Sequence, residues 1–156
     1  MSISLAISPR ALQSSRRLRQ AHTRLTVSTR GKGLYPFTRS VEKWVADQGV
    51  RDGLLTIFVQ HTSCSLVIQE NADPDVTLDL RDYFERLVPE DRGDYRHTLE
   101  GPDDMTSHIR STLTGVSTGI PLIGGRVALG TWQGLYLFEH RTVSHERSVV
   151  LHFIGE

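Results

Sequence analysis

The stretch LLTIFVQHTSCSLVIQ, residues Leu54–Gln69, places two apolar runs of strand length on either side of a short polar turn. The first run, Leu54–Val59, is almost continuously apolar, which predicts a central strand covered on both faces. The second run resumes at Ser65 and predicts the next strand. Polar side chains that follow a buried strand are held rigidly, so His61-Thr62-Ser63 is a candidate site segment. A hydroxyl-rich turn without a binding role would explain the same residues equally well.

Toward the N-terminus, the sequence predicts one strand and one helix before this stretch. Residues Thr23–Thr29 alternate between apolar and polar side chains, as the first strand of the folded domain would. The helix is expected to start with Thr38 as its cap, since apolar residues then recur at helical spacing at Val41, Trp44 and Val45. A glycine closes it at position 49.

Toward the C-terminus, a second helix is followed by a β-rich third of the chain. Asp73 before Pro74 is a helix start with proline in the first turn, and the apolar spacing carries this helix to Val88. After the next helix, Gly124-Gly125 indicates a hairpin. Four further strands are expected, at 120–123, 126–129, 132–141 and 147–154.

These elements predict an α+β fold with about three helices and a mixed, largely antiparallel sheet of about seven strands. So wide a sheet with so few helices leaves apolar area uncovered. We therefore expect other copies of the chain to cover part of it.

The stretch YRHTLEGPDDMTSHIR, Tyr95–Arg110, gathers histidines and acidic residues around a helix start. Asp103 is placed to cap the helix with its side chain. Asp104 and His108 are four residues apart and therefore lie on one helical face, with His97 shortly before. Two imidazoles and one carboxylate suit zinc, manganese or magnesium. Alternatively, this is a capped amphipathic helix whose histidine is merely satisfied by a neighbour. In either case the expected buried stripe is Met105, Ile109, Thr112 and Leu113.

The composition fits a single domain in a reducing compartment. The chain has 156 residues and one cysteine, Cys64, so an intrachain disulfide is excluded and a cytoplasmic location is expected. Lys plus Arg and Asp plus Glu number 18 each, so net charge favours neither nucleic acid nor membrane as a partner. We expect a flexible basic extension at residues 1–22 and one domain at 23–156. The acid-free start also fits an organellar transit peptide.

Three motifs together resemble the YjbQ-like family, whose members are called secondary thiamine-phosphate synthases. They are HTSCSLVIQENADPDV (61–76), YRHTLEGPDDMTSHIRSTL (95–113) and GRVALGTWQGLYLFEHR (125–141). The resemblance implies an α+β fold with a mixed sheet, a homotrimer, and a site near the subunit boundary. It implies a reaction that joins hydroxymethylpyrimidine diphosphate to a thiazole phosphate and releases diphosphate.

The resemblance and the chemistry of that reaction imply roles for individual residues. We expect a divalent metal (Zn, Mg or Mn) on His97, Asp104 and His108. The expected catalytic residues are His61, Glu70, Asp73 and Glu139. The expected substrate- or anion-binding residues are Thr62, Ser63, Asn71, Gln133 and Arg141. Three alternatives stay open at this point: a trimeric module that binds a metal or an anionic metabolite without catalysis, a metal-dependent phosphohydrolase, and histidines that only tie loops together.

Overall fold

The computed structural model describes residues 17–90, 93 and 95–156, and this part of the chain forms two antiparallel sheets and three helices. The larger sheet has five strands in the order β1-β8-β3-β5-β6. Their bounds are Arg19–Ser28 (β1), Gly53–Val59 (β3), Ser117–Ile123 (β5), Arg126–Val127 (β6) and Glu146–Gly155 (β8). The long strand β1 pairs with β8 over its full length, so residues 19–22 lie inside the sheet.

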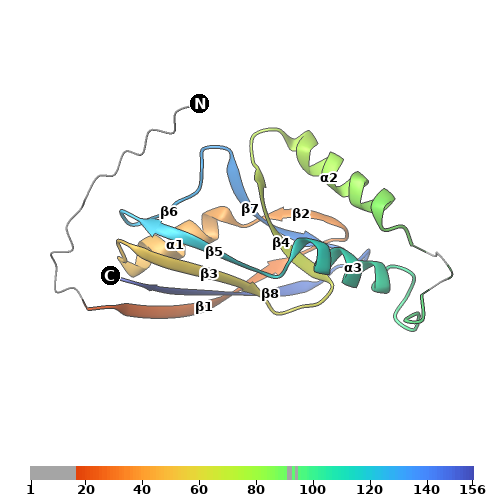
Figure 1. The fold of residues 1–156 in the computed structure, drawn as a ribbon, viewed down its shortest axis with the longest axis horizontal. Coiled ribbons are helices and arrows are strands. Elements are labelled where there is room, and N and C mark those ends of the chain that lie inside the picture. Colours follow the sequence, from red (N-terminus) through yellow and green to blue (C-terminus); the bar gives the residue numbers. More distant parts are fainter. Residues whose placement is uncertain (1–16, 91–92, 94) are drawn as a thin grey trace, which may run out of the picture.

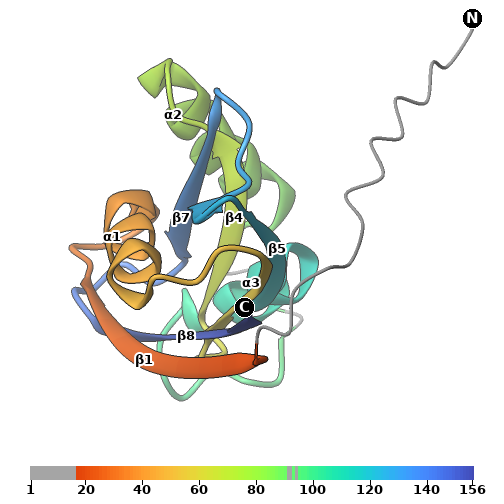
Figure 2. The same ribbon diagram turned by 90° about the vertical axis from the view of Figure 1, so that its left-hand side faces the viewer.

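The smaller sheet has three strands in the order β2-β7-β4. Their bounds are Gly33–Pro36 (β2), Cys64–Glu70 (β4) and Gln133–Glu139 (β7). Figure 1 shows β4 and β7 rising away from the larger sheet, and Figure 2 shows β1 and β8 as a separate layer beneath them. The predicted α+β class is confirmed, but the strands divide between two sheets.

The hydrophobic core lies between the two sheets and one helix. Alternate residues of β3 and β8 point inward, among them Leu55 and Leu151, and they meet Leu137 of β7. The opposite face of the larger sheet stays open: Leu54 and Phe58 are 45% and 43% exposed. The expectation that 54–59 would be covered on both faces is therefore wrong for the described chain. An antiparallel sheet can face solvent on one side because its strands need no crossover helices.

The three helices begin and end close to the expected residues. Helix α1 (Thr38–Gln48) starts after Phe37, so Thr38 is its first residue rather than its cap, and the Thr38 hydroxyl bonds to the backbone of Leu135 instead. Helix α2 (Pro74–Leu87) starts as predicted, with the Asp73 side chain accepting from the Asp75 amide. None of the three helices is long and apolar enough to cross a membrane.

Helix α2 stands away from the core, and ion pairs tie its C-terminal half to the rest of the chain. It contains no buried residue and projects beyond the sheets in Figure 1. The fully buried guanidinium of Arg110 donates two hydrogen bonds to Glu85, at 2.6 and 3.0 Å, and a third to the carbonyl of Val88. Lys32 adds an ion pair to Glu85 at 3.0 Å. Glu85 is therefore part of an ion-pair network with Arg110 and Lys32.

Helix α3 (Asp104–Thr114) buries its polar face, the reverse of the expected stripe. Its buried residues are Asp104, Thr106, Ser107, Arg110 and Ser111, whereas Leu113 is 59% exposed. Its N-cap position is Asp103, as predicted, but the Asp103 side chain makes no capping bond. The helix thus presents acceptors and hydroxyls to the protein body. Such an arrangement is stable only where each buried polar group finds a partner.

Candidate metal site and its surroundings

The structure brings His97, Asp104 and His108 together at the N-terminal end of α3. The Oδ2 atom of Asp104 lies 2.7 Å from Nε2 of His97 and 3.4 Å from Nε2 of His108. The two imidazole rings are 5.5 Å apart. One ligand atom from each residue lies within 4.8 Å of the other two, and this is the one such group in residues 17–90, 93 and 95–156. The predicted trio is therefore a cluster in space.

The buried oxygen of Asp104 fits a metal ligand. Asp104 is 2% exposed, yet its Oδ2 atom receives no hydrogen bond. A buried carboxylate oxygen without a donor costs free energy of desolvation. A divalent cation between Oδ2 and the two Nε2 atoms would remove that cost. Two histidines and one carboxylate are also a donor set that zinc accepts with an open position.

The other oxygens around the trio are held by a basic residue and a threonine. Arg141 pairs with Oδ1 of Asp104 and, at 3.1 Å, with Oδ2 of Asp103. The backbone and hydroxyl of Thr142 also donate to that Asp103 oxygen, at 2.8 and 3.0 Å. Burial alone would raise the pKa of Asp103, but these hydrogen bonds hold it below its usual value. Arg141 thus orients the acidic pair, and it also donates to the carbonyl of Glu100.

The turn after β3 reaches the trio through its backbone. The carbonyl oxygen of Thr62 lies 3.0 Å from Nδ1 of His108. A metal-binding histidine commonly donates its second ring N–H to such an acceptor, which fixes the ring and its tautomer. The backbone of Thr62 is thus the part of the predicted segment His61-Thr62-Ser63 that contacts the trio.

Glu139 lies inside the protein in a saturated ion pair. Its carboxylate is fully buried and accepts two bonds of 2.6 Å from Arg147 and one of 2.9 Å from Thr29. The backbone amides of His140 and Arg141 also donate to it. Burial alone would raise the pKa of Glu139, yet Arg147 and these other donors hold it low. The Glu139 carboxylate therefore fixes the backbone at His140 and Arg141.

Two further histidines have structural partners. Nε2 of His61 accepts the backbone N–H of Ser148 at 2.8 Å, and burial followed by the nearby Arg147 lowers the pKa of His61. His140 is fully buried beside Phe138, with Nε2 2.9 Å from the Ser65 hydroxyl. Burial, assisted by surrounding cations, lowers the pKa of His140 to about 3. Both rings are neutral at pH 7.

The remaining predicted site residues lie at the opposite end of the smaller sheet. Strand β4 touches α3 at Cys64, whose carbonyl accepts from Ser111, and reaches Glu70 six residues later. At about 3.3 Å per residue, Glu70 is roughly 20 Å along the strand from Cys64, and Asn71, Asp73 and Gln133 lie at the same end as Glu70. Asn71 and Gln133 hydrogen-bond each other through the Gln133 carbonyl, at 3.3 Å. The structure therefore divides the predicted constellation in two.

Of these four residues, Asn71 and Gln133 line a broad groove of about 1,090 Å³. The groove is lined by Asn71, Gln133 and Tyr136 together with Arg39 and Arg126. Within it, the Gln133 side chain accepts from the Gly130 amide and so closes its own turn. The Tyr136 hydroxyl donates to the Glu70 carbonyl at 3.1 Å.

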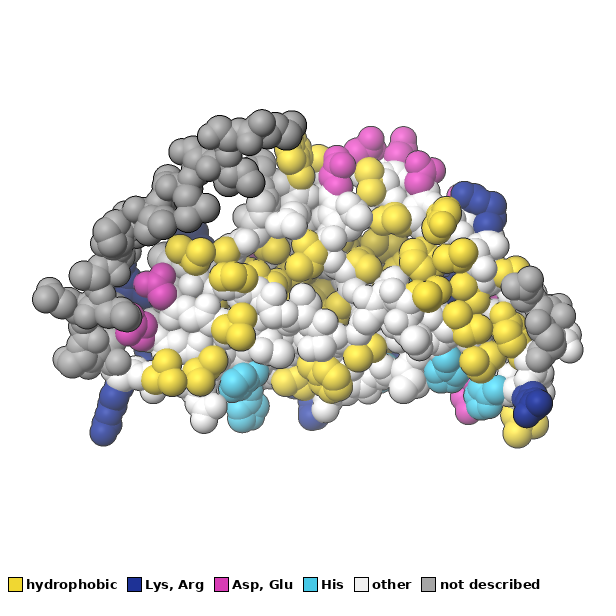
Figure 3. All heavy atoms as spheres, in the orientation of Figure 1, with side chains coloured by type: hydrophobic (Ala, Val, Ile, Leu, Met, Phe, Trp, Pro, Cys, Tyr) yellow, Lys and Arg dark blue, Asp and Glu magenta, His cyan; other side chains and the backbone are white. Residues whose placement is uncertain are grey.

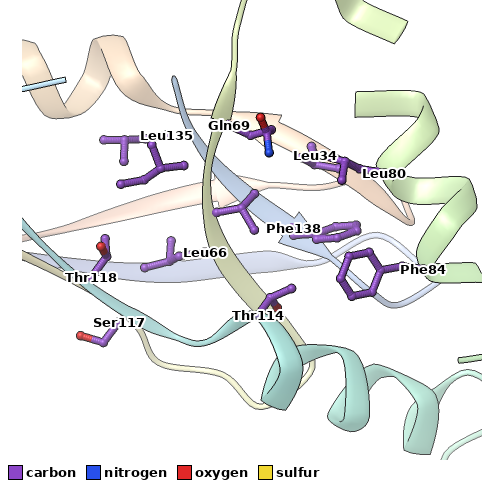
Figure 4. Close-up of a pocket in the computed structure, with 12 residues that line it drawn as sticks. Leu34, Leu66, Gln69, Leu80, Phe84, Thr114, Ser117, Thr118, Leu135 and Phe138 are labelled. Carbon is purple, nitrogen blue, oxygen red and sulfur yellow. The ribbon is translucent and has the colours of Figure 1, made fainter. Parts of the chain in front are cut away.

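A separate apolar cleft of about 360 Å³ lies between β4 and α2 (Figure 4). Phe84 of α2 meets Phe138 of β7 edge-on at 5.3 Å, with Leu34 and Leu80 alongside. No residue of the trio lines this cleft. It is thus a surface apart from the candidate metal site.

Cys64, the first residue of β4, belongs to the hydrophobic core. It is fully buried, and burial raises the pKa of its thiol to about 12. A thiol that holds its proton so firmly is a poor nucleophile at neutral pH.

Comparisons with known proteins assign the chain to a family. The family model described as UPF0047 protein YjbQ-like matches residues 23–156. UPF0047 protein sll1880 of Synechocystis is 51% identical over 145 residues, covering 93% of this chain and 99% of that protein. UPF0047 protein YjbQ of Escherichia coli O157:H7 is 43% identical over 133 residues, with 85% and 96% covered.

Solved structures share the fold. The crystal structure of a YbjQ-like protein of unknown function from Sulfolobus solfataricus matches with a TM-score of 0.83 at 25% identity, covering 90% of this chain and all of that one. A conserved hypothetical protein from Thermus thermophilus matches with a TM-score of 0.74 at 38% identity, with 83% and 97% covered. From motifs, fold and relatives together, the chain belongs to the UPF0047, YjbQ-like family.

Proposed function

We propose that His97, Asp104 and His108 bind one divalent cation, and that the protein uses this site as a thiamine-phosphate synthase-type transferase. The observation that carries the proposal is the buried Oδ2 atom of Asp104, which lies between two imidazole nitrogens without a hydrogen-bond donor. Zinc, manganese and magnesium are all compatible with this donor set.

The chain's own residues would position that centre. Arg141 and Thr142 hold the two aspartates, and the Thr62 carbonyl orients His108. Since His97 is exposed, a phosphorylated substrate could reach the site from solvent. When bound, the cation would offset the negative charge that develops on a departing diphosphate.

The proposed reaction makes one bond and breaks one. The lone pair of the thiazole nitrogen forms a C–N bond to the methylene carbon of the pyrimidine, and the C–O bond to diphosphate breaks with its electron pair on oxygen. No proton has to be removed in this step. A site without a free general base suits it, and Glu139 and His61 are already engaged by Arg147 and Ser148. We therefore give Glu139 and His61 positioning roles.

We further infer that the protein works as a homotrimer. Two features support other copies as partners: the apolar cleft of Figure 4, and helix α2, which buries no residue in the chain itself. Several large apolar side chains on α2 are exposed, including Leu78, Tyr83 and Leu87. Sedimentation should therefore give three times the chain mass of 17.5 kDa at micromolar concentration. A stable monomer under those conditions would contradict the assembly.

The synthase proposal is tested by supplying both substrates. Purified protein loaded with zinc or manganese should form thiamine phosphate from hydroxymethylpyrimidine diphosphate and thiazole phosphate, with saturable kinetics. His108→Ala should lose both the metal and the activity. Release of phosphate from the pyrimidine diphosphate alone would point to a phosphohydrolase instead. Metal binding without turnover of either kind would indicate a binding module.

A further inference from the structure

A pocket of about 700 Å³ adjoins the trio and shares His108 with it. Asp104, His108 and Thr112 are spaced four residues apart, so they follow one another along a single stripe of α3. Two members of the trio, Asp104 and His108, occupy the first two positions of that stripe. The pocket extends from His108 past Thr112. Figure 3 shows histidine side chains beside an apolar surface at the end of the molecule that carries α3. Any ligand on the metal would therefore have this pocket next to it.

The lining of the pocket carries no charged side chain. Its lining residues include no Lys, Arg, Asp or Glu. Its apolar walls are formed by Phe58, Val59 and Val116. Its second histidine, His61, accepts a backbone N–H at Nε2 and is neutral. Phosphate groups need cations or several N–H donors, which this lining does not supply. An uncharged ring, by contrast, gains from burial against apolar and aromatic walls.

We propose that this pocket binds the uncharged heteroaromatic ring of a phosphorylated substrate whose phosphates lie at the trio. The inference rests on the proposed function for the position of the phosphates, but the ring pocket itself is argued from its own lining. Phe58 supplies a flat aromatic wall and is 43% exposed, so it is accessible without rearrangement. Pocket shape at Phe58, Thr112 and Val116 would then set which ring is accepted.

The test fills the pocket while leaving the three side chains of the trio unsubstituted. Thr112 is an exposed position of α3, so Thr112→Trp should fold and place an indole in the pocket. Leu113→Trp is the matched control, because Leu113 is the next exposed position of the same helix and does not line the pocket. Phe58→Leu is a second variant, which removes the flat wall but keeps an apolar side chain.

Two probes separate the ring site from the metal site. The first is 4-amino-5-hydroxymethyl-2-methylpyrimidine, which carries the ring and no phosphate, and the second is zinc alone. We expect the full chain to bind the pyrimidine by calorimetry, with affinity reduced at least about tenfold in Thr112→Trp and Phe58→Leu and unchanged in Leu113→Trp. Zinc affinity should be the same in all four proteins.

Two outcomes would overturn the ring pocket: a wild-type protein that binds no pyrimidine, or pyrimidine affinity unaffected by both pocket variants. Either can occur while zinc still binds, which would leave the metal proposal intact. Conversely, pyrimidine binding that is sensitive to Thr112→Trp in a protein that binds no zinc would uphold the pocket and remove the metal-assisted function.

Discussion

The Nδ1 atom of His108 lies 3.0 Å from the carbonyl oxygen of Thr62, although 46 positions separate the two residues in the sequence. With its Nδ1 hydrogen donated to that carbonyl, the ring presents the lone pair of Nε2 toward Asp104. A metal ligand needs this tautomer. The turn between β3 and β4 therefore prepares a side chain of α3 for coordination.

Asp104→Asn should weaken divalent metal binding by at least about 100-fold. The substitution keeps the shape of the side chain but removes a negative charge that the two imidazoles cannot replace. Even residues that only hydrogen-bond to a metal ligand commonly lower metal affinity by about 10- to 100-fold when substituted. Calorimetric titration with zinc and manganese measures the effect. Asp79→Asn, an exposed position on α2, is the control and should titrate like the wild type. Equal affinity in the two variants would count against the trio.

Glu139→Gln should lower the free energy of unfolding by about 3–5 kcal/mol, because it leaves the buried guanidinium of Arg147 without its counter-charge. Denaturant unfolding followed by circular dichroism gives this value. Zinc affinity of the folded variant should stay near that of the wild type. A variant of undiminished stability that had lost its activity would instead make Glu139 a catalytic group.

Stability should fall as the pH is lowered from about 6.5, and His140 should account for part of that slope. The pKa of His140 is lowered from 6.5 to about 3 in the folded chain. Between these values the unfolded chain binds a proton that the folded chain refuses, so acid favours unfolding by up to about 1.4 kcal/mol per pH unit. His140→Gln removes this titration. Urea unfolding from pH 7 to pH 5 should show a shallower slope for His140→Gln, and parallel slopes for the two proteins would disprove the assignment.

Local signals predicted much of the fold. Asp73-Pro74 marked the start of α2, Gly49 ended α1 in a left-handed conformation, and Gly124-Gly125 made the hairpin between β5 and β6. These succeed because a cap or a positive φ is decided by a few neighbouring residues. The short strand β2 was not expected, since a strand of four residues depends on its pairing with β7 more than on its own sequence.

The candidate site was predicted in part. The spacing of Asp104 and His108 placed both on one face of α3, and the structure brings the third expected ligand, His97, beside them. The burial of that face was predicted wrongly, because apolar periodicity cannot show that a helix buries polar groups paired by distant residues. The buried ion pair of Arg147 could have been predicted from the alternation of β8. Arg147 lies on the same inward face as Val149 and Leu151, and a buried arginine needs an acidic partner.

The most direct test of the metal site is anomalous diffraction from a crystal grown without chelator and soaked in manganese or zinc. The account predicts one strong anomalous peak within coordination distance of Nε2 of His97, Oδ2 of Asp104 and Nε2 of His108, about 2.0–2.2 Å for zinc. The peak should be absent from Asp104→Asn crystals treated in the same way. A wild-type crystal with no peak at these three atoms, or with a donor hydrogen-bonded to Oδ2 in its place, would contradict it.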